Sequence, residues 1–407
     1  MRWGTEPRDR RRMVRRATAP SGHLSTMTMA YATVLLLAPF LGASPAIAQG
    51  VDADAWNAAI SRFEQKMEAQ VAADDVGGVS AAVARGSDVV WARAFGWADR
   101  DRRIPAGVGS IYRTGSISKT VTAVAMMRAV ERGFIDLDQP LSEIFPATAR
   151  FPDAREGAPA PTVRQFASHT AGLVREPDWD IAASGPIEIW QERIVESIPL
   201  SRFQNAPGVE YSYSNIGYGT LGLAVARAVG RPFMEFVEED VFKPLGMTSS
   251  TFVIGPELAP RLTVGYVNRG DGNPDPEQPT REHAGRGYKV PNGGVYSTVG
   301  DLARFIGALQ GRASPAILSA ESVAEMSRVH TPEDPDNGYG LGVMIRTTDD
   351  GARLIGHSGS VAGYNAYMLF EPQSGLGVVL LRNYNQGEAS LGAAGQELLV
   401  ELLGALR

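Results

Sequence analysis

The sequence predicts an α+β protein in which one antiparallel sheet, made from both ends of the chain and flanked by helices, carries an inserted, mostly helical lobe. β-favouring runs cluster near the beginning and the end of the chain, whereas residues 187–246 show helical periodicity with Pro and Gly breaks. The 407 residues, 44% of them hydrophobic, are enough for a large core in two lobes. We expect an α/β lobe from about 49–115 and 290–407, and a helical lobe from about 116–289.

Residues 1–48 have the three-part form of an export signal. An arginine-rich start is followed by an apolar run at 31–41 and by the small-residue cleavage sequence Ala46-Ile47-Ala48. The apolar run is shorter than the ~20 residues that span a membrane. We therefore expect a periplasmic or secreted protein whose mature chain, residues 49–407, is a single catalytic domain with no membrane span.

Composition narrows the possible partners. The chain has a formal net charge of −6, and residues 1–48 hold seven Arg and two acidic residues, so the mature chain carries about −11. Such an acidic protein is a poor match for nucleic acid or anionic lipid, and we expect neither. There is no cysteine, and the five histidines are scattered without metal-ligand spacing. We expect no metal and no cofactor, and the oligomeric state is left open.

The first elements follow from periodicity. Residues 54–72 place Trp56, Ile60, Phe63 and Met67 on one stripe of an amphipathic helix. Two β-favouring runs, 79–84 and 89–95, are joined by the turn sequence Arg85-Gly86-Ser87-Asp88 and predict a hairpin. A helix should then run from Ser116 to about Arg132, with Gly133 as its C-cap.

The rest of the chain mixes loops, helices and strands. Residues 136–146 are expected to form turns and a loop, and the polar segment 268–286, rich in Gly and Pro, an exposed loop or flap. Helices are expected at 162–168, 299–309 and 388–403, and strands at 340–346, 352–356, 366–371 and 377–382.

The helix at 116–132 begins with unusual polar residues for an otherwise apolar segment. Ser116 and Lys119 are three residues apart and so share a helix face. Burial and the positive end of the helix dipole both lower the pKa of Lys119, favouring a neutral amine that could activate the serine. The alternative is that Ser116 only caps the helix while Lys119 extends to solvent.

Two further stretches carry candidate chemistry. Tyr213 and Asn215 alternate just before a helix and can face the same side, where the tyrosine could move a proton if nearby positive charge lowers its pKa. The Asn215 amide could hold a substrate carbonyl and accept a hydrogen bond from the lysine. The glycine-rich stretch 356–364, with His357, is placed between the end of one strand and the start of the next. Taken singly, these stretches are better explained as a helix cap and a glycine-rich surface turn.

Together and in this order, Ser116-x-x-Lys119, Tyr213-x-Asn215 and His357-x-Gly359 resemble the three motifs of the serine β-lactamase and penicillin-binding-protein superfamily. The Tyr-x-Asn element is similar to that of the class C-like branch. The resemblance covers the chain from about residue 60 to 400, including segments 96–99, 137–138, 168–173, 244–247 and 293–298. It implies the β-lactamase/transpeptidase-like fold.

The resemblance also implies roles. Ser116 would be acylated, Lys119 and Tyr213 would move the proton, and Asn215 would orient the substrate amide. The backbone N–H groups of Ser116 and Ser360, the latter beside Gly359 on the edge strand, would form the oxyanion hole.

His357 departs from the family pattern, which usually has a lysine there to hold a substrate carboxylate. A histidine is mostly neutral at pH 7 and would be a weaker clamp. The resemblance therefore favours an exported serine hydrolase, first a peptidase or amidase on small peptides, then a carboxylesterase, then a β-lactamase. Its expected partner is a small-molecule or small-peptide substrate. A non-catalytic penicillin-binding-like protein is the alternative from another class.

N-terminal sequencing of exported protein should find Gln49 or a close neighbour, because residues 1–48 have the form of a cleaved signal. Active cytosolic protein that still begins at Met1 or Met13 would contradict this expectation.

Overall fold

The computed structural model describes residues 51–152, 158–270, 273–349 and 351–406. The export signal expected at 1–48 lies outside these residues. Across the described ranges, no helix is both long enough and apolar enough to cross a membrane.

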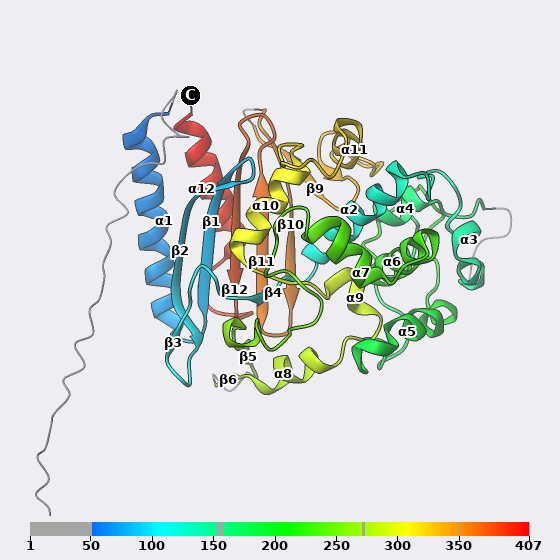
Figure 1. The fold of residues 1–407 in the computed structure, drawn as a ribbon, viewed down its shortest axis with the longest axis horizontal. Helices are drawn as coiled ribbons and strands as arrows, with labels where there is room; N and C mark the ends of the chain where they lie inside the picture. The colour runs from blue at the N-terminus through cyan, green and yellow to red at the C-terminus, as the bar shows by residue number, and fades with distance from the viewer. Residues whose placement is uncertain (1–50, 153–157, 271–272, 350, 407) are drawn as a thin grey trace, which may run out of the picture. The chain divides into compact units, whose positions relative to one another are not determined.

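A single antiparallel sheet is the framework of the described chain (Figure 1). Its eight strands, counted over the described residues, lie in the order β3-β2-β1-β12-β11-β10-β9-β8. The first chain end supplies β1 (Gly78–Arg85), β2 (Asp88–Asp99) and β3 (Ile104–Pro105); the second supplies β8 (Gly338–Tyr339), β9 (Met344–Thr347), β10 (Arg353–Val361), β11 (Tyr364–Phe370) and β12 (Leu376–Arg382). The predicted α+β class, with a sheet built from both ends, is confirmed.

The two chain ends meet in the centre of the sheet. Strand β1 pairs with β12 from Val79↔Arg382 to Arg85↔Leu376. Alternate residues of these strands face opposite sides: Val79, Ala81 and Val83 belong to one hydrophobic cluster and Ala82 to the other. This period of two is what a strand buried on both faces requires.

Helices cover both faces of the sheet (Figure 1). Helices α1 (Ala53–Asp74) and α12 (Leu391–Gly404) pack side by side on one face, and α1 buries the predicted stripe of Trp56, Ile60, Phe63 and Met67. Helix α10 (Val299–Leu309) and the inserted helical region cover the other face. That region contains α2 (Ile117–Glu131), α3 (Leu141–Ile144), α4 (Val163–Ala167), α5 (Trp190–Ser197), α6 (Asn215–Val229), α7 (Phe233–Val237), α8 (Glu277–Ala284) and α9 (Val290–Gly293); α11 (Ala320–Met326) follows α10.

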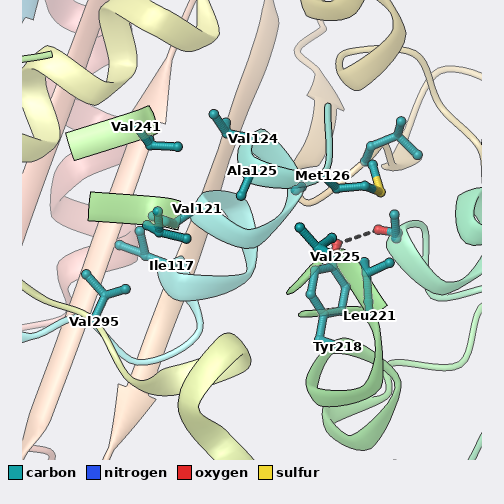
Figure 2. Close-up of a cluster of buried hydrophobic side chains, with 14 of the residues drawn as sticks. Ile117, Val121, Val124, Ala125, Met126, Tyr218, Leu221, Val225, Val241 and Val295 are labelled. Carbon is teal, nitrogen blue, oxygen red and sulfur yellow. Dashed lines mark hydrogen bonds between the residues drawn. The ribbon is translucent and has the colours of Figure 1, made fainter. Parts of the chain in front are cut away.

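Helix α2 is buried on nearly all sides, as its sequence predicts. Figure 2 shows its apolar side chains packed between Tyr218, Leu221 and Val225 of α6 on one side and Val241 and Val295 on the other. Each fully buried Val or Met side chain is worth about 1.5–3 kcal/mol relative to exposure. This packing fixes the position of the helix, and therefore of its first turn, against β10 and β11.

Three expectations about local structure need correction. The segment 268–286 is not an open loop: it forms the β5–β6 pair (Val267–Asn268 and Pro274–Asp275) and α8, and buries Asp275 and Arg286. The strand expected at 340–346 begins only at Met344, as β9, because residues 340–343 form a bend after β8 in which Gly342 has φ +76°. Residues 141–144 form the short helix α3 within the expected loop.

A buried ion pair joins α1 to the end of β12. Arg382 is fully buried and its guanidinium donates to Asp74 and, at 3.1 Å, to the carbonyl of Ala389. By contrast, the Lys66–Glu397 pair between α1 and α12 is exposed.

Asp74→Ala should lower the free energy of unfolding by about 3–5 kcal/mol, because it leaves a buried guanidinium without its counter-charge. The matched control Glu397→Ala should cost less than about 1 kcal/mol, as exposed ion pairs do. Urea unfolding of the two variants tests the difference, and equal losses would contradict it.

Candidate functional site

Ser116 and Lys119 lie at the start of α2 with their polar atoms in contact. Ser116 occupies the N-cap position, but its hydroxyl makes no capping hydrogen bond, so it remains available. Lys119 is fully buried, and its Nζ lies 3.0 Å from Ser116 Oγ and 3.2 Å from the carbonyl oxygen of Asn292. The alternative of an exposed, solvated Lys119 is therefore wrong.

Burial lowers the pKa of Lys119 well below its ordinary value, with the charge of Glu176 opposing this shift and that of Arg175 adding to it. A neutral amine can accept a proton from the serine hydroxyl. The pair thus has the geometry and the protonation tendency of a nucleophile beside its base.

Tyr213 completes a compact group with this pair. A hydrogen bond links its side chain to Ser116, and Lys119 Nζ lies 4.7 Å from the centre of its ring. Burial nevertheless raises the pKa of Tyr213 to about 12, although the Ser116 hydrogen bond and the charge of Arg175 act to lower it. The lowered pKa that would favour proton transfer by this tyrosine is not reached, because burial outweighs the charge of Arg175. Tyr213 is a protonated phenol at neutral pH.

The ring of His169 packs against the ring of Tyr213. Their ring centroids are 4.2 Å apart, and His169 Nδ1 accepts a hydrogen bond from the backbone N–H of Ser214 at 3.0 Å. The histidine has a left-handed backbone, with φ +60°, which a non-glycine residue adopts at some cost. Burial lowers its pKa well below the ordinary value. A neutral imidazole therefore fixes the segment that presents Tyr213.

Asn215 lies next to this group but does not contact the lysine. It is the first residue of α6, is buried, and donates from Nδ2 to Glu176 Oε1 at 2.6 Å. Glu176 also accepts from the hydroxyl of Tyr288 and lies 3.7 Å from Lys289. The expected hydrogen bond from Lys119 to Asn215 is absent among the described contacts, since the amine uses the Asn292 carbonyl instead.

Strand β10 presents an open edge to this group. It pairs with β9 only over Arg353–Gly356, whereas its pairing with β11 continues to Val361↔Tyr364. In an antiparallel hairpin closed at that pair, alternate N–H groups turn away from β11, and Ser360 N–H is one of them. The glycine-rich stretch 356–364 thus covers the second half of β10 and its turn into β11, so His357, Gly359 and Ser360 lie within a strand and only the end of the stretch joins two strands as expected.

Two glycines allow β10 and the start of α2 to approach closely. A Cβ added to Gly359 would lie 2.0 Å from the Thr114 carbonyl oxygen and 3.0 Å from Ser116 N. A Cβ added to Gly115, which has φ +52°, would lie 2.8 Å from Ser360 N. The backbone nitrogens of Ser116 and Ser360 therefore lie close together, where the resemblance places the oxyanion hole.

His357 is held inside the protein. It is 3% exposed, its Nε2 lies 2.9 Å from the Tyr339 hydroxyl, and its Nδ1 lies 2.6 Å from the Ser358 carbonyl oxygen. Burial, with a further effect of Lys119, lowers the pKa of His357 to about 3. The ring is neutral at pH 7, as the sequence predicts, and both of its nitrogens have partners within the protein.

The expected site residues meet at one cavity of about 780 Å³. The residues that line it include Ser116, Tyr213, His357, Gly359 and Ser360. Lys119 and Asn215 are not among the lining residues. The cavity extends along β10 and β11 to the first turns of α12. In the described ranges, no three His, Asp or Glu side chains are grouped so that they could hold a metal ion.

Four residues that touch this group were missed in the sequence: His169, Arg175, Glu176 and Tyr339. His169 lies within the family-like segment 168–173, and Arg175 and Glu176 follow that segment in the same loop. Their position in or next to this segment was the only sign in the sequence that they belong to the site. Tyr339 had none, because its contact with His357 depends on the bend between β8 and β9.

Comparison with known proteins identifies the family of the chain. The beta-lactamase family model matches residues 63–401. The chain is 27% identical over 328 residues to the D-alanyl-D-alanine-carboxypeptidase/endopeptidase AmpH of Escherichia coli, covering 77% of this chain and 81% of AmpH. It is 29% identical over 353 residues to the esterase EstB of Burkholderia gladioli, covering 75% of this chain and 86% of EstB.

A solved structure has the same architecture. The octameric penicillin-binding protein homologue from Pyrococcus abyssi superposes with a TM-score of 0.71 at 26% identity, over 85% of this chain and 77% of that one. With a family match across most of its length, the chain belongs to the beta-lactamase family and is a serine hydrolase.

Proposed function

We propose that the protein is an exported serine hydrolase that forms an acyl-enzyme on Ser116 and acts on small peptides as a peptidase or amidase. The observation that carries this proposal is the contact between the buried amine of Lys119 and Ser116 Oγ at 3.0 Å, opposite the open edge of β10. The relatives AmpH, a carboxypeptidase/endopeptidase, and EstB, an esterase, support acyl transfer chemistry.

The two pKa shifts support an order for the proton steps. Lys119, whose pKa is lowered, takes the proton of Ser116 as Oγ attacks the substrate carbonyl. Tyr213 remains protonated and passes its proton to the departing amine or alcohol while it is reprotonated from Lys119. The oxyanion is held by the N–H groups of Ser116 and Ser360, each worth ~2.7–4 kcal/mol of barrier. Water then releases the acyl group by the reverse proton route.

The remaining site residues position the substrate. Asn215, held by Glu176, would orient the amide of the acyl part, and an extended peptide could add to the open edge of β10 at His357, Gly359 and Ser360. Residues 49–407 would then work as one catalytic domain.

Carboxylesterase activity is the second candidate, because EstB is a relative and an ester needs no carboxylate clamp. β-Lactamase activity ranks third, since His357 is neutral and offers no fixed positive charge. A screen against aminoacyl p-nitroanilides of both hands, p-nitrophenyl esters and nitrocefin separates the three. A non-catalytic binding protein would turn over none of them and would resist labelling by a fluorophosphonate.

Ser116→Ala should abolish both turnover and covalent labelling while the protein stays folded, because only a hydroxyl is removed. Lys119→Ala and Tyr213→Phe should each lower kcat/KM at least ~10²-fold, the usual effect of losing a positioned acid–base group. Steady-state rates and labelling test this, with circular dichroism as the control for folding. Near wild-type rates in Ser116→Ala would place the nucleophile elsewhere.

The pH dependence of kcat/KM for a neutral ester should show activity rising with pH through the lowered pKa of Lys119, since only the unprotonated amine accepts the proton. Because the pKa of Tyr213 is raised to about 12, no fall from its ionisation is expected at moderately alkaline pH. Lys119→Arg should be inactive throughout, as a guanidinium stays protonated. A fall near neutral pH that disappears in Tyr213→Phe would contradict this assignment.

A further inference from the structure

The cavity beside Ser116 has a charge that the motifs do not explain. Arg175 and Arg346 line it, and no aspartate or glutamate does among the described residues. This is unexpected in a chain with a net charge of −6. A cavity with cations alone attracts and holds negatively charged groups.

Arg175 is fixed beside the reacting atoms. Its backbone carbonyl accepts the N–H of Asn215 at 2.9 Å, and its guanidinium carbon lies 4.9 Å from the centre of the Tyr213 ring. The residue is exposed and, over the described ranges, its side chain forms no ion pair with an acidic residue. The neighbouring Glu176 is occupied by Asn215 and Tyr288. Arg175 thus presents a permanent, unneutralised charge to the cavity.

Position 357, where the resemblance leads us to expect a positive charge for a substrate carboxylate, carries no charge in this protein. His357 is buried, neutral and hydrogen-bonded through both nitrogens. Arg346 is too distant: it is opposite Leu354 on β10, six residues before Ser360, or about 20 Å along a strand. Of the two arginines, Arg175 is the one that a small substrate bound at Ser116 can reach.

We propose that Arg175 recognises a carboxylate on the leaving group of the substrate, in place of the residue at 357. This inference rests on the proposed function. Tyr213 must deliver a proton to the leaving group and therefore lies beside it, and Arg175 packs against Tyr213. The substrates favoured are acyl compounds whose departing part ends in a free carboxylate, such as peptides cleaved near their C-terminus. A planar guanidinium binds a carboxylate through two parallel hydrogen bonds.

A matched pair of thioesters tests the proposal on the full chain: N-benzoylglycyl thioglycolate, with a carboxylate on the leaving group, and its methyl ester, without one. In each turnover, Ser116 Oγ displaces the sulfur, the thiolate takes a proton, and water later releases N-benzoylglycine. A chromogenic disulfide measures the thiol without background from the protein, because the chain has no cysteine.

In Arg175→Gln, the ratio of kcat/KM for the acid over that for the methyl ester should fall about ten- to a hundred-fold relative to wild type, the range for a charged hydrogen bond. Arg175→Lys should keep part of the ratio. The control is Arg202→Gln, which removes an equal positive charge close to Arg175 in space. The backbone of Arg202 pairs with Val174, but the residue lines a separate surface hollow and not the cavity beside Ser116. This control should leave the ratio unchanged.

An unchanged ratio in Arg175→Gln would overturn the proposal, as would an equal fall in Arg202→Gln, which would indicate only a general effect of net charge. A wild-type enzyme that prefers the methyl ester would also overturn it. If the wild type cleaves neither thioester and is not acylated, the proposed serine hydrolase function itself fails. Turnover of the methyl ester by each variant shows that the variant is folded.

Discussion

The burial of one amine is the constraint on which this site depends. Lys119 lies in the first turn of a helix that is apolar on nearly every side, where a charged ammonium has neither water nor a directly bonded carboxylate. Its partners are a serine hydroxyl and a backbone carbonyl, both of which a neutral amine can satisfy. The same packing that stabilises α2 therefore sets the protonation state of its lysine. Stability and reactivity have one physical origin here.

The sheet contributes the other half of the site. Strand β10 loses its neighbour β9 after Gly356, and the free edge then runs past the start of α2. Gly115 and Gly359 remove the side chains that would keep these two elements apart. The backbone nitrogens of Ser116 and Ser360, one at the start of a helix and one on a strand, lie close together because the core holds both elements. A surface loop could not place them with equal accuracy.

The elements with strong periodicity could be predicted from the sequence, and those set by long-range contacts could not. Helix α10 and the first hairpin follow from local pattern alone. Helix α8 was missed because its polar residues and its proline, within a segment rich in Gly, resemble a loop when its packing is unknown. The motif residues were found, yet the hydrogen bond of Asn215 and the direction of the Tyr213 shift depend on Glu176 and on burial, neither of which spacing reports.

The pairing of β1 with β12 also has a consequence for how the chain matures. Val79 and Arg382 are neighbours in the sheet, although about three hundred residues separate them in the sequence. Contacts of such long range form slowly, and a ribosome must release nearly the whole chain before the central strand pair can close. The nascent polypeptide therefore has no finished sheet while it is being made. The surroundings of the nucleophile are therefore completed only when synthesis is nearly finished.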